Sequence, residues 1–111
     1  MADCIFCAIR DGEIPSTVVN RTDGFFAIRD IAPKADVHVL VIPDEHIEDF
    51  RGIGALSAEQ SKRLLEFIAD TAARCGAEEY RVMSLCGAGA GQSVFHLHFH
   101  VLAGTVRGMP A

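Results

Sequence analysis

Three of the five histidines in this chain alternate with apolar residues in the stretch Ser93–Leu102. In an extended strand, successive side chains point to opposite faces, so His96, His98 and His100 share one face and the apolar residues between them share the other. Histidines two residues apart on a strand lie roughly 6–7 Å apart. A row of imidazoles at that spacing is a poor way to fill a core, whereas it suits binding an anion, binding a metal ion or attacking an electrophile.

The composition indicates one globular domain, residues 1–111, in which 50% of residues are hydrophobic and 23% are charged. The net charge of −5 and the lack of a basic run argue against nucleic acid as a partner. No stretch reaches the ~20 apolar residues that span a membrane, and the first residues do not resemble a secretory signal. We therefore expect a cytoplasmic protein whose four cysteines are thiols or metal ligands rather than disulfides.

The hydrophobic pattern predicts an α+β fold: an antiparallel sheet with one long and one short helix. The expected strands are Thr17–Val19, Phe25–Ile28, His38–Ile42, Tyr80–Leu85 and the histidine stretch, with a hairpin turn at Asn20–Gly24. The expected helices are Cys4–Arg10, a short one within Ile47–Gly54, and a long one that Ser57 and Gln60 open as a capping box and Gly76 ends. The long helix has an apolar stripe that a sheet or a partner subunit must cover, formed by Leu64, Leu65, Ile68, Ala72 and Cys75.

The residues before the histidine stretch favour catalysis. The loop Gly87–Gln92 has only small side chains until Gln92, so its backbone amides can approach a phosphate closely, and Ser93 adds a hydroxyl donor. On this interpretation His98 is a nucleophile or base flanked by two tuning histidines. Coordination of one metal ion by all three histidines, or a solvated strand face, remain the alternatives. The pair Cys4-x-x-Cys7 is by itself equally compatible with buried thiols or a redox pair.

The stretch Gly91–Leu102 resembles the signature of the histidine triad (HIT) nucleotide-binding family, His-φ-His-φ-His-φ-φ with φ apolar. Upstream segments with the family's order and spacing are Ile14–Pro15, Asp30–Pro33 and His38–His46. Within the family, Ser93 is similar to the phosphoramidase (Hint-like) branch, because the dinucleoside polyphosphate hydrolase branch usually has threonine there. A transferase of the superfamily has glutamine in place of the last histidine, here His100.

The resemblance implies a hydrolase that cleaves purine nucleoside phosphoramidates, of the AMP-amidate or aminoacyl-adenylate type. His98 would attack the α-phosphorus to form a nucleotidyl-histidine, which water then hydrolyses. His100 would hydrogen-bond to the phosphoryl and leaving-group atoms, Ser93 would donate to the leaving group, and His38 would fix the tautomer of His98. The remaining nucleotide-binding residues implied are Phe6 and Ile28 at the base, Asp30 and Ile31 at the ribose, and Gly91 and Gln92 at the phosphate. Phe6 and Ile28 are equally well explained as core residues.

The resemblance also implies structural zinc and a homodimer. The zinc ligands would be Cys4, Cys7, His46 and His96, a closed set with no open position. Two sheets would pair through the long helix and a sheet edge into a ten-stranded sheet.

The chain departs from the phosphoramidase branch at Leu85, where an asparagine usually contacts the phosphate, and Ser84 is the neighbour that would have to compensate. The tail Arg107–Pro110 also differs, without the usual tryptophan. Alternative functions are therefore dinucleoside polyphosphate hydrolysis, or a nucleotide-binding regulatory module with weak catalysis.

Overall fold

Almost every residue of two segments is buried, and these segments form the middle of the sheet. They are β2 (Phe25–Arg29) and β3 (Ala35–Pro43). With β1 (Val18–Thr22), β4 (Arg81–Met83) and β5 (Phe99–Val106) they make an antiparallel sheet in the order β1-β2-β3-β5-β4. The structure, a computed structural model, describes residues 4–108. The α+β fold with a five-stranded antiparallel sheet is therefore confirmed.

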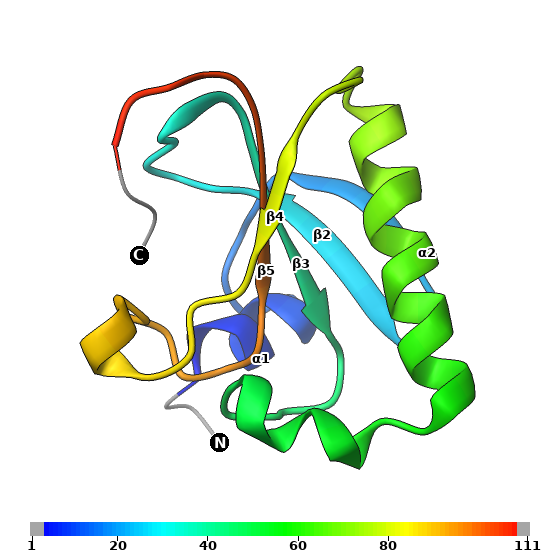
Figure 1. Cartoon of the computed structure of the whole chain (residues 1–111). Helices are drawn as coiled ribbons and strands as arrows, with labels where there is room; N and C mark the ends of the chain where they lie inside the picture. The colour runs from blue at the N-terminus through cyan, green and yellow to red at the C-terminus, as the bar shows by residue number, and fades with distance from the viewer. Residues whose placement is uncertain (1–3, 109–111) are drawn as a thin grey trace.

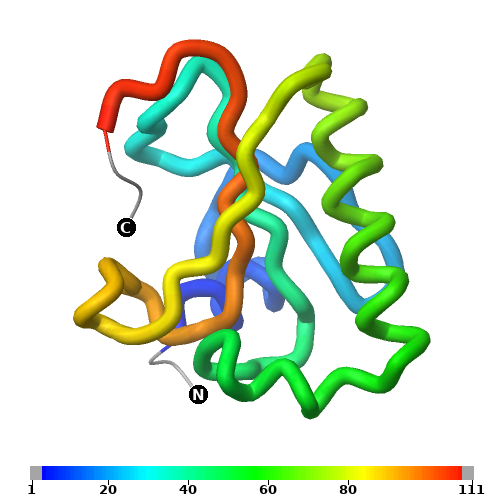
Figure 2. The backbone as a smooth tube through the Cα atoms, in the orientation of Figure 1, coloured from blue at the N-terminus to red at the C-terminus, as the bar shows by residue number. Residues whose placement is uncertain are grey.

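The long helix α2 (Ala58–Arg74) lies along one face of this sheet (Figures 1 and 2). The capping box is present, because the Ser57 hydroxyl accepts from the Gln60 amide and the Gln60 side chain accepts from the Ser57 amide. Leu64 and Ile68 are buried in the core between helix and sheet, whereas Leu65 is 65% exposed. Including Leu65 in the buried stripe was wrong, and the sheet of the same chain, rather than a second subunit, covers Leu64 and Ile68.

The other face of the sheet packs against the short helix α1 (Ile5–Arg10), in which Phe6 joins a second core with Phe26, Ile28, Leu40 and Ile42. The alternation of β2 explains the two layers, since Phe25 and Ala27 belong to the core under α2 and the residues between them to the core under α1. Neither this helix nor any other within residues 4–108 has the length and apolar character needed to cross a bilayer.

Several boundaries differ from the sequence-based prediction. β1 continues through Thr22, so the hairpin turn is only Asp23-Gly24. β4 is three residues long, and β5 begins at Phe99 rather than at Ser93. The short helix expected within Ile47–Gly54 is the 3₁₀ helix η1 (Phe50–Ala55), which extends one residue further, and the glycine-rich loop contains η2 (Ala88–Ala90). β5 ends at Val106, and residues 1–3 and 109–111, including part of the altered tail, lie outside the described residues.

A bulge in β5 leaves no room for a side chain at Gly104. Between the pairs Val37–Ala103 and Ala35–Val106, β5 advances three residues while β3 advances two. Gly104 has φ of 79°, and an added Cβ would lie 2.8 Å from the Cβ of Asp36. Gly104→Ala is therefore expected to lower the free energy of unfolding by about 2–3 kcal/mol in denaturant titrations.

The matched control for this prediction is Gly54→Ala. An added Cβ at Gly54 meets nothing within 4 Å, and Gly54 is not among the glycines with positive φ. We expect a change of no more than about 0.5 kcal/mol there. Equal effects of the two substitutions would contradict the role assigned to the bulge.

Candidate active site and metal cluster

The three triad histidines lie on the α1 side of the molecule. Leu97, Phe99 and Val101 belong to the core under α2, so the alternation of faces is confirmed even though regular strand begins only at Phe99. The Phe6 ring lies edge-on to His96 and His98, with centroid distances of 5.9 and 5.0 Å. All three histidines are buried, at 0–2% exposure. The core therefore contains the imidazoles, but each of them has a polar partner.

The backbone defines the tautomer of His98. Its Nδ1 lies 2.7 Å from the carbonyl oxygen of His96. A carbonyl can only accept a hydrogen bond, so Nδ1 carries the proton and the lone pair of the neutral ring is on Nε2. A neutral imidazole in this state can act as a nucleophile or as a base through Nε2.

His38 defines the tautomer of His100. The Lys34 amide donates to Nδ1 of His38 at 2.9 Å, so the proton of the neutral His38 ring is on Nε2. This Nε2 lies 2.9 Å from Nδ1 of His100 and donates to it, which leaves the His100 proton on Nε2. Burial lowers the pKa of His38 and favours the neutral ring, although Asp30, with Oδ2 3.4 Å from His38 Nε2, acts in the opposite direction. The neutral His100 ring can therefore donate a hydrogen bond from Nε2.

The expected role of His38 needs a correction at this point. We predicted that His38 fixes the tautomer of His98, but the carbonyl of His96 does so, and the His38 side chain bonds to His100. The His98 and His100 rings are neighbours, with centroids 5.0 Å apart. The sequence could not distinguish these partners, because the assignment depends on which histidine of the segment lies opposite β3.

A pocket of about 400 Å³ opens beside His98 and is large enough for a nucleoside. The predicted residues that line it are Phe6, Ile28, Asp30, Ile31, His38, Ser93 and His98. Ile31 is 96% exposed and forms the rim, whereas Phe6 and Ile28 are buried and belong both to the core and to the wall. Sequence reasoning missed Ile9, Leu40 and Val94, which also line this pocket, although the apolar spacing of α1 contains the signal for Ile9.

Gly91 and Gln92 were expected to contact the phosphate, but their backbone amides are engaged within the loop. Their amides donate to the carbonyls of Ala88 and Gly87 within the loop, so these N–H groups are not directed at a phosphate. The Gln92 side chain is buried, accepts from the Gly87 amide, and donates to the carbonyls of Glu48 and Val94. Gln92 therefore determines the path of the chain into the histidine segment rather than holding a ligand.

Ser84 does not replace the missing asparagine at Leu85. Its hydroxyl donates to the carbonyl of His98 at 2.8 Å, and this bond uses its only proton. Ser84 thus contributes to the position of the His98 backbone and not to phosphate binding.

The second cluster brings together Cys4, Cys7, His46 and His96, whose nearest ligand atoms all lie within 4.8 Å of one another. His96 donates from Nε2 to the Pro43 carbonyl at 2.8 Å, so its lone pair is on Nδ1, which faces the cluster. Burial lowers the pKa of His96 to about 4 and raises that of the Cys7 thiol. A metal ion would displace the thiol protons and find neutral imidazole nitrogens in place.

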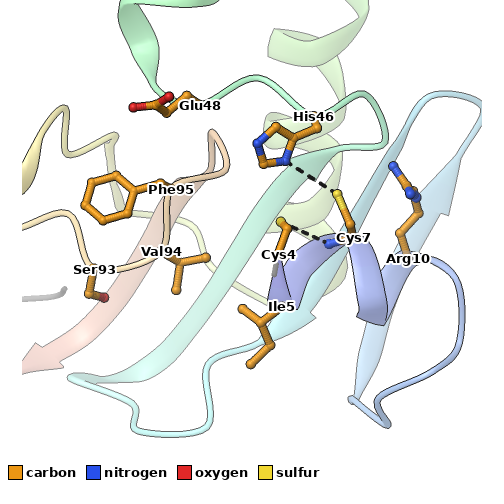
Figure 3. Close-up of a pocket in the computed structure, with 9 residues that line it drawn as sticks. All are labelled: Cys4, Ile5, Cys7, Arg10, His46, Glu48, Ser93, Val94 and Phe95. Carbon is orange, nitrogen blue, oxygen red and sulfur yellow. Dashed lines mark hydrogen bonds between the residues drawn. The ribbon is translucent and has the colours of Figure 1, made fainter. Parts of the chain in front are cut away.

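The spacing of these donors fits a tetrahedral ion. Metal–ligand lengths typical of zinc imply nitrogen–nitrogen edges of about 3.3 Å and sulfur–nitrogen edges of about 3.6 Å. The two Nδ1 atoms of His46 and His96 are 3.2 Å apart, and Cys7 Sγ lies 3.4 and 3.6 Å from them. Cys4 Sγ lies 3.2 Å from His96 Nδ1 and also accepts from the Cys7 amide as the N-cap of α1 (Figure 3). The four residues could therefore hold a metal ion.

These features define a class: a small α+β protein with a histidine cluster beside a nucleoside-sized pocket and a Cys/His cluster next to it. Residues 11–106 match the family model described as HIT domain. The chain belongs to the HIT domain family.

Relatives and solved structures agree with this assignment. An uncharacterized HIT-like protein of Helicobacter pylori is 40% identical over 102 residues, covering 90% of this chain and 95% of that protein. The structure described as a HIT family hydrolase from Legionella pneumophila superposes with a TM-score of 0.86 at 36% identity, covering 97% of this chain and 98% of that one. A HIT family hydrolase from Clostridium thermocellum gives 0.83 at 36% identity, covering 99% of this chain and 97% of that one.

Proposed function

We propose that the protein is a nucleotide hydrolase that cleaves purine nucleoside phosphoramidates, AMP-amidates or aminoacyl-adenylate-like compounds, through a covalent nucleotidyl-histidine at His98. The observation that carries the proposal is the bond from His98 Nδ1 to the His96 carbonyl, because it leaves the lone pair on Nε2 of a ring that lines a nucleoside-sized pocket. The similarity to two structures described as HIT family hydrolases supports hydrolysis as the reaction class.

In the proposed reaction, the purine binds between Phe6 and Ile28, and Asp30 accepts hydrogen bonds from the ribose hydroxyls. Nε2 of His98 forms a bond to the α-phosphorus, and the bond from phosphorus to the leaving nitrogen breaks. His100 is buried and is not among the residues that line the pocket, so it would have to move toward the phosphate to donate from Nε2 to a phosphoryl oxygen, where negative charge develops. Ser93, which is exposed to solvent, donates a hydrogen bond to the leaving nitrogen, and this nitrogen takes up its proton from solvent. Water then attacks phosphorus, releases AMP and restores His98.

The proposal extends to the metal and the assembly. Cys4, Cys7, His46 and His96 are proposed to hold zinc, which would tie the start of α1 to the chain after β3 and to the histidine segment; the chemistry of a closed Cys₂His₂ site is structural. We place the protein in the cytoplasm, in keeping with thiols at all four cysteines of the described chain. A homodimer remains a proposal from the family resemblance, and a monomer in analytical ultracentrifugation would contradict it.

Substrate comparison tests the reaction class. We expect kcat/KM for an AMP-amidate to exceed that for diadenosine tetraphosphate by at least about tenfold, which corresponds to about 1.4 kcal/mol of differential transition-state binding. The reverse preference would favour a dinucleoside polyphosphate hydrolase.

One specific observation favours the weaker alternative, a regulatory module. Leu85 cannot donate a hydrogen bond to a phosphate, and the Ser84 hydroxyl is already bonded to the His98 carbonyl. Binding of AMP without hydrolysis of either substrate would support that alternative.

A further inference from the structure

A second pocket, of about 720 Å³, adjoins the nucleoside pocket. Ile5, Ser93 and Val94 line both pockets, so the two lie side by side with these side chains at their boundary. Figure 3 shows Ser93 and Phe95 on one side of the second pocket and Cys4 and His46 on the other. Cys4, Cys7 and His46 of the proposed metal site also line this pocket, whereas the part bordered by Ser93, Val94 and Phe95 has no occupant in the proposed reaction.

The position of Ser93 relates the second pocket to the reaction. His98 lines the nucleoside pocket and is not among the residues that line the second one. At a phosphorus centre the attacking and leaving atoms lie roughly in line, so the leaving group extends away from the His98 ring. Ser93 borders both pockets, and a leaving group that passes its hydroxyl enters the second pocket.

Three apolar side chains, those of Ile5, Val94 and Phe95, line one part of the second pocket. Phe95 is 45% exposed and Ile5 is 42% exposed, and Val94 lies between them (Figure 3). Exposed apolar side chains that converge on one pocket, rather than being scattered singly, indicate contact with an apolar ligand.

The charges of the second pocket disfavour a phosphate chain. Its carboxylate, Glu48, is exposed. The guanidinium of Arg10 is already engaged, because Nε and Nη2 donate to the Asp11 carboxylate and Nη1 donates to the Asp44 carbonyl. No other lysine or arginine is among the residues found to line this pocket in the described chain. An anionic leaving group would therefore meet Glu48, and the lining guanidinium, that of Arg10, is already paired with Asp11.

We infer that the second pocket binds the leaving group of the substrate, and that it selects an amine with an aromatic or aliphatic body, neutral or positively charged, over an anionic one. The inference rests on the proposed function, because it assumes that a phosphorus–nitrogen bond breaks at His98. The amine that departs takes up one proton from solvent, and the nucleotidyl group stays on His98 until water attacks phosphorus, which breaks the bond to His98 and returns one proton to solvent.

Two AMP-amidates test the apolar wall, one formed with phenethylamine and one with methylamine. The measured quantity is the ratio of their kcat/KM values. Phe95→Ala is expected to lower the preference for the phenethylamine compound about tenfold, since the ring loses its apolar contact. The matched control is Phe50→Ala, because Phe50 is 47% exposed and is not among the lining residues, and it should leave the ratio unchanged.

A second pair of AMP-amidates tests the charge, with arms of equal length that end in an ammonium or a carboxylate. We expect the wild type to favour the ammonium arm about fivefold, and Glu48→Gln to remove most of that preference. Glu66→Gln on α2 is the control, since Glu66 is exposed and pairs with Lys62. Because the charges are at the surface, the preference should shrink in high salt.

The outcomes separate this inference from the proposed function. Hydrolysis of both amine compounds with ratios that do not respond to Phe95→Ala or Glu48→Gln would overturn the leaving-group pocket and leave the proposed function intact. Failure of the wild type to hydrolyse any AMP-amidate would overturn both. Ratios that respond equally to Phe95→Ala and Phe50→Ala would indicate a general loss of structure and would also count against the pocket.

Discussion

Replacing His98 with alanine is expected to lower kcat/KM for an AMP-amidate by at least about 10³-fold and to abolish the nucleotidyl adduct that mass spectrometry should detect on the wild type during turnover. The reason is that Nε2 of His98 carries the lone pair, whereas the neighbouring His100 is prepared as a donor by His38. Rapid quenching followed by peptide mapping locates the adduct.

The variant His98→Asn distinguishes chemistry from structure. An asparagine amide can still donate to the His96 carbonyl, as Nδ1 of His98 does, but it cannot attack phosphorus. We expect His98→Asn to keep the thermal stability of the wild type within a few degrees, to bind AMP, and to be as inactive as His98→Ala. Substantial activity in either variant, or an adduct on another residue, would contradict the assignment of His98.

Loss of the metal is expected to have the largest effect on stability. Cys4→Ser should reduce zinc content, measured by atomic emission, from about one ion per chain to well below one, and should lower Tm by about 10–15 °C, equivalent to about 3 kcal/mol. Serine is itself a favoured N-cap, so it can still accept from the Cys7 amide as the Cys4 sulfur does. The loss of stability therefore reports on the metal and not on the start of α1.

The control for the metal prediction is Cys86→Ser. Cys86 is partly exposed like Cys4, but it does not belong to the Cys/His cluster. Its substitution should leave zinc content unchanged and Tm within a few degrees. If the wild type lacks metal as purified and is no less stable than after addition of zinc, the cluster has no structural ion.

Much of the fold could be predicted because its signals are local. The apolar run Val39–Ile42 in β3, the apolar run Phe25–Ile28 in β2 and the Ser57–Gln60 capping box each depend on residues close in the sequence. The ends of the strands were harder to predict, because a strand extends only as far as the neighbouring strand offers residues to pair with. The first residue of β5 that pairs with β3 is Phe99, opposite Val41, so β5 begins there. His96 and His98 precede this pair.

For the site, too, the location of the residues could be predicted from the sequence, whereas their hydrogen-bond partners could not. The residues that the family signature implied do lie together in the structure, in the Cys/His cluster and around the nucleoside-sized pocket. The signature did not reveal which groups the hydrogen bonds engage. The donors of Gly91 and Gln92 turn inward because the loop forms a short 3₁₀ turn, and His38 meets His100 because strands β3 and β5 are adjacent. Such pairings depend on three-dimensional packing and leave no trace in residue spacing.

His96 serves the two clusters with different atoms. Its ring nitrogen Nδ1 faces the cysteines, while its carbonyl oxygen orients the ring of His98. A substitution at position 96 would therefore change two things at once, since it removes a proposed metal ligand and can shift the backbone carbonyl that aligns His98, the proposed nucleophile. The proposed metal site is better tested at His46 or Cys4, where the His96 side chain stays in place and its backbone carbonyl keeps the position that holds the His98 ring.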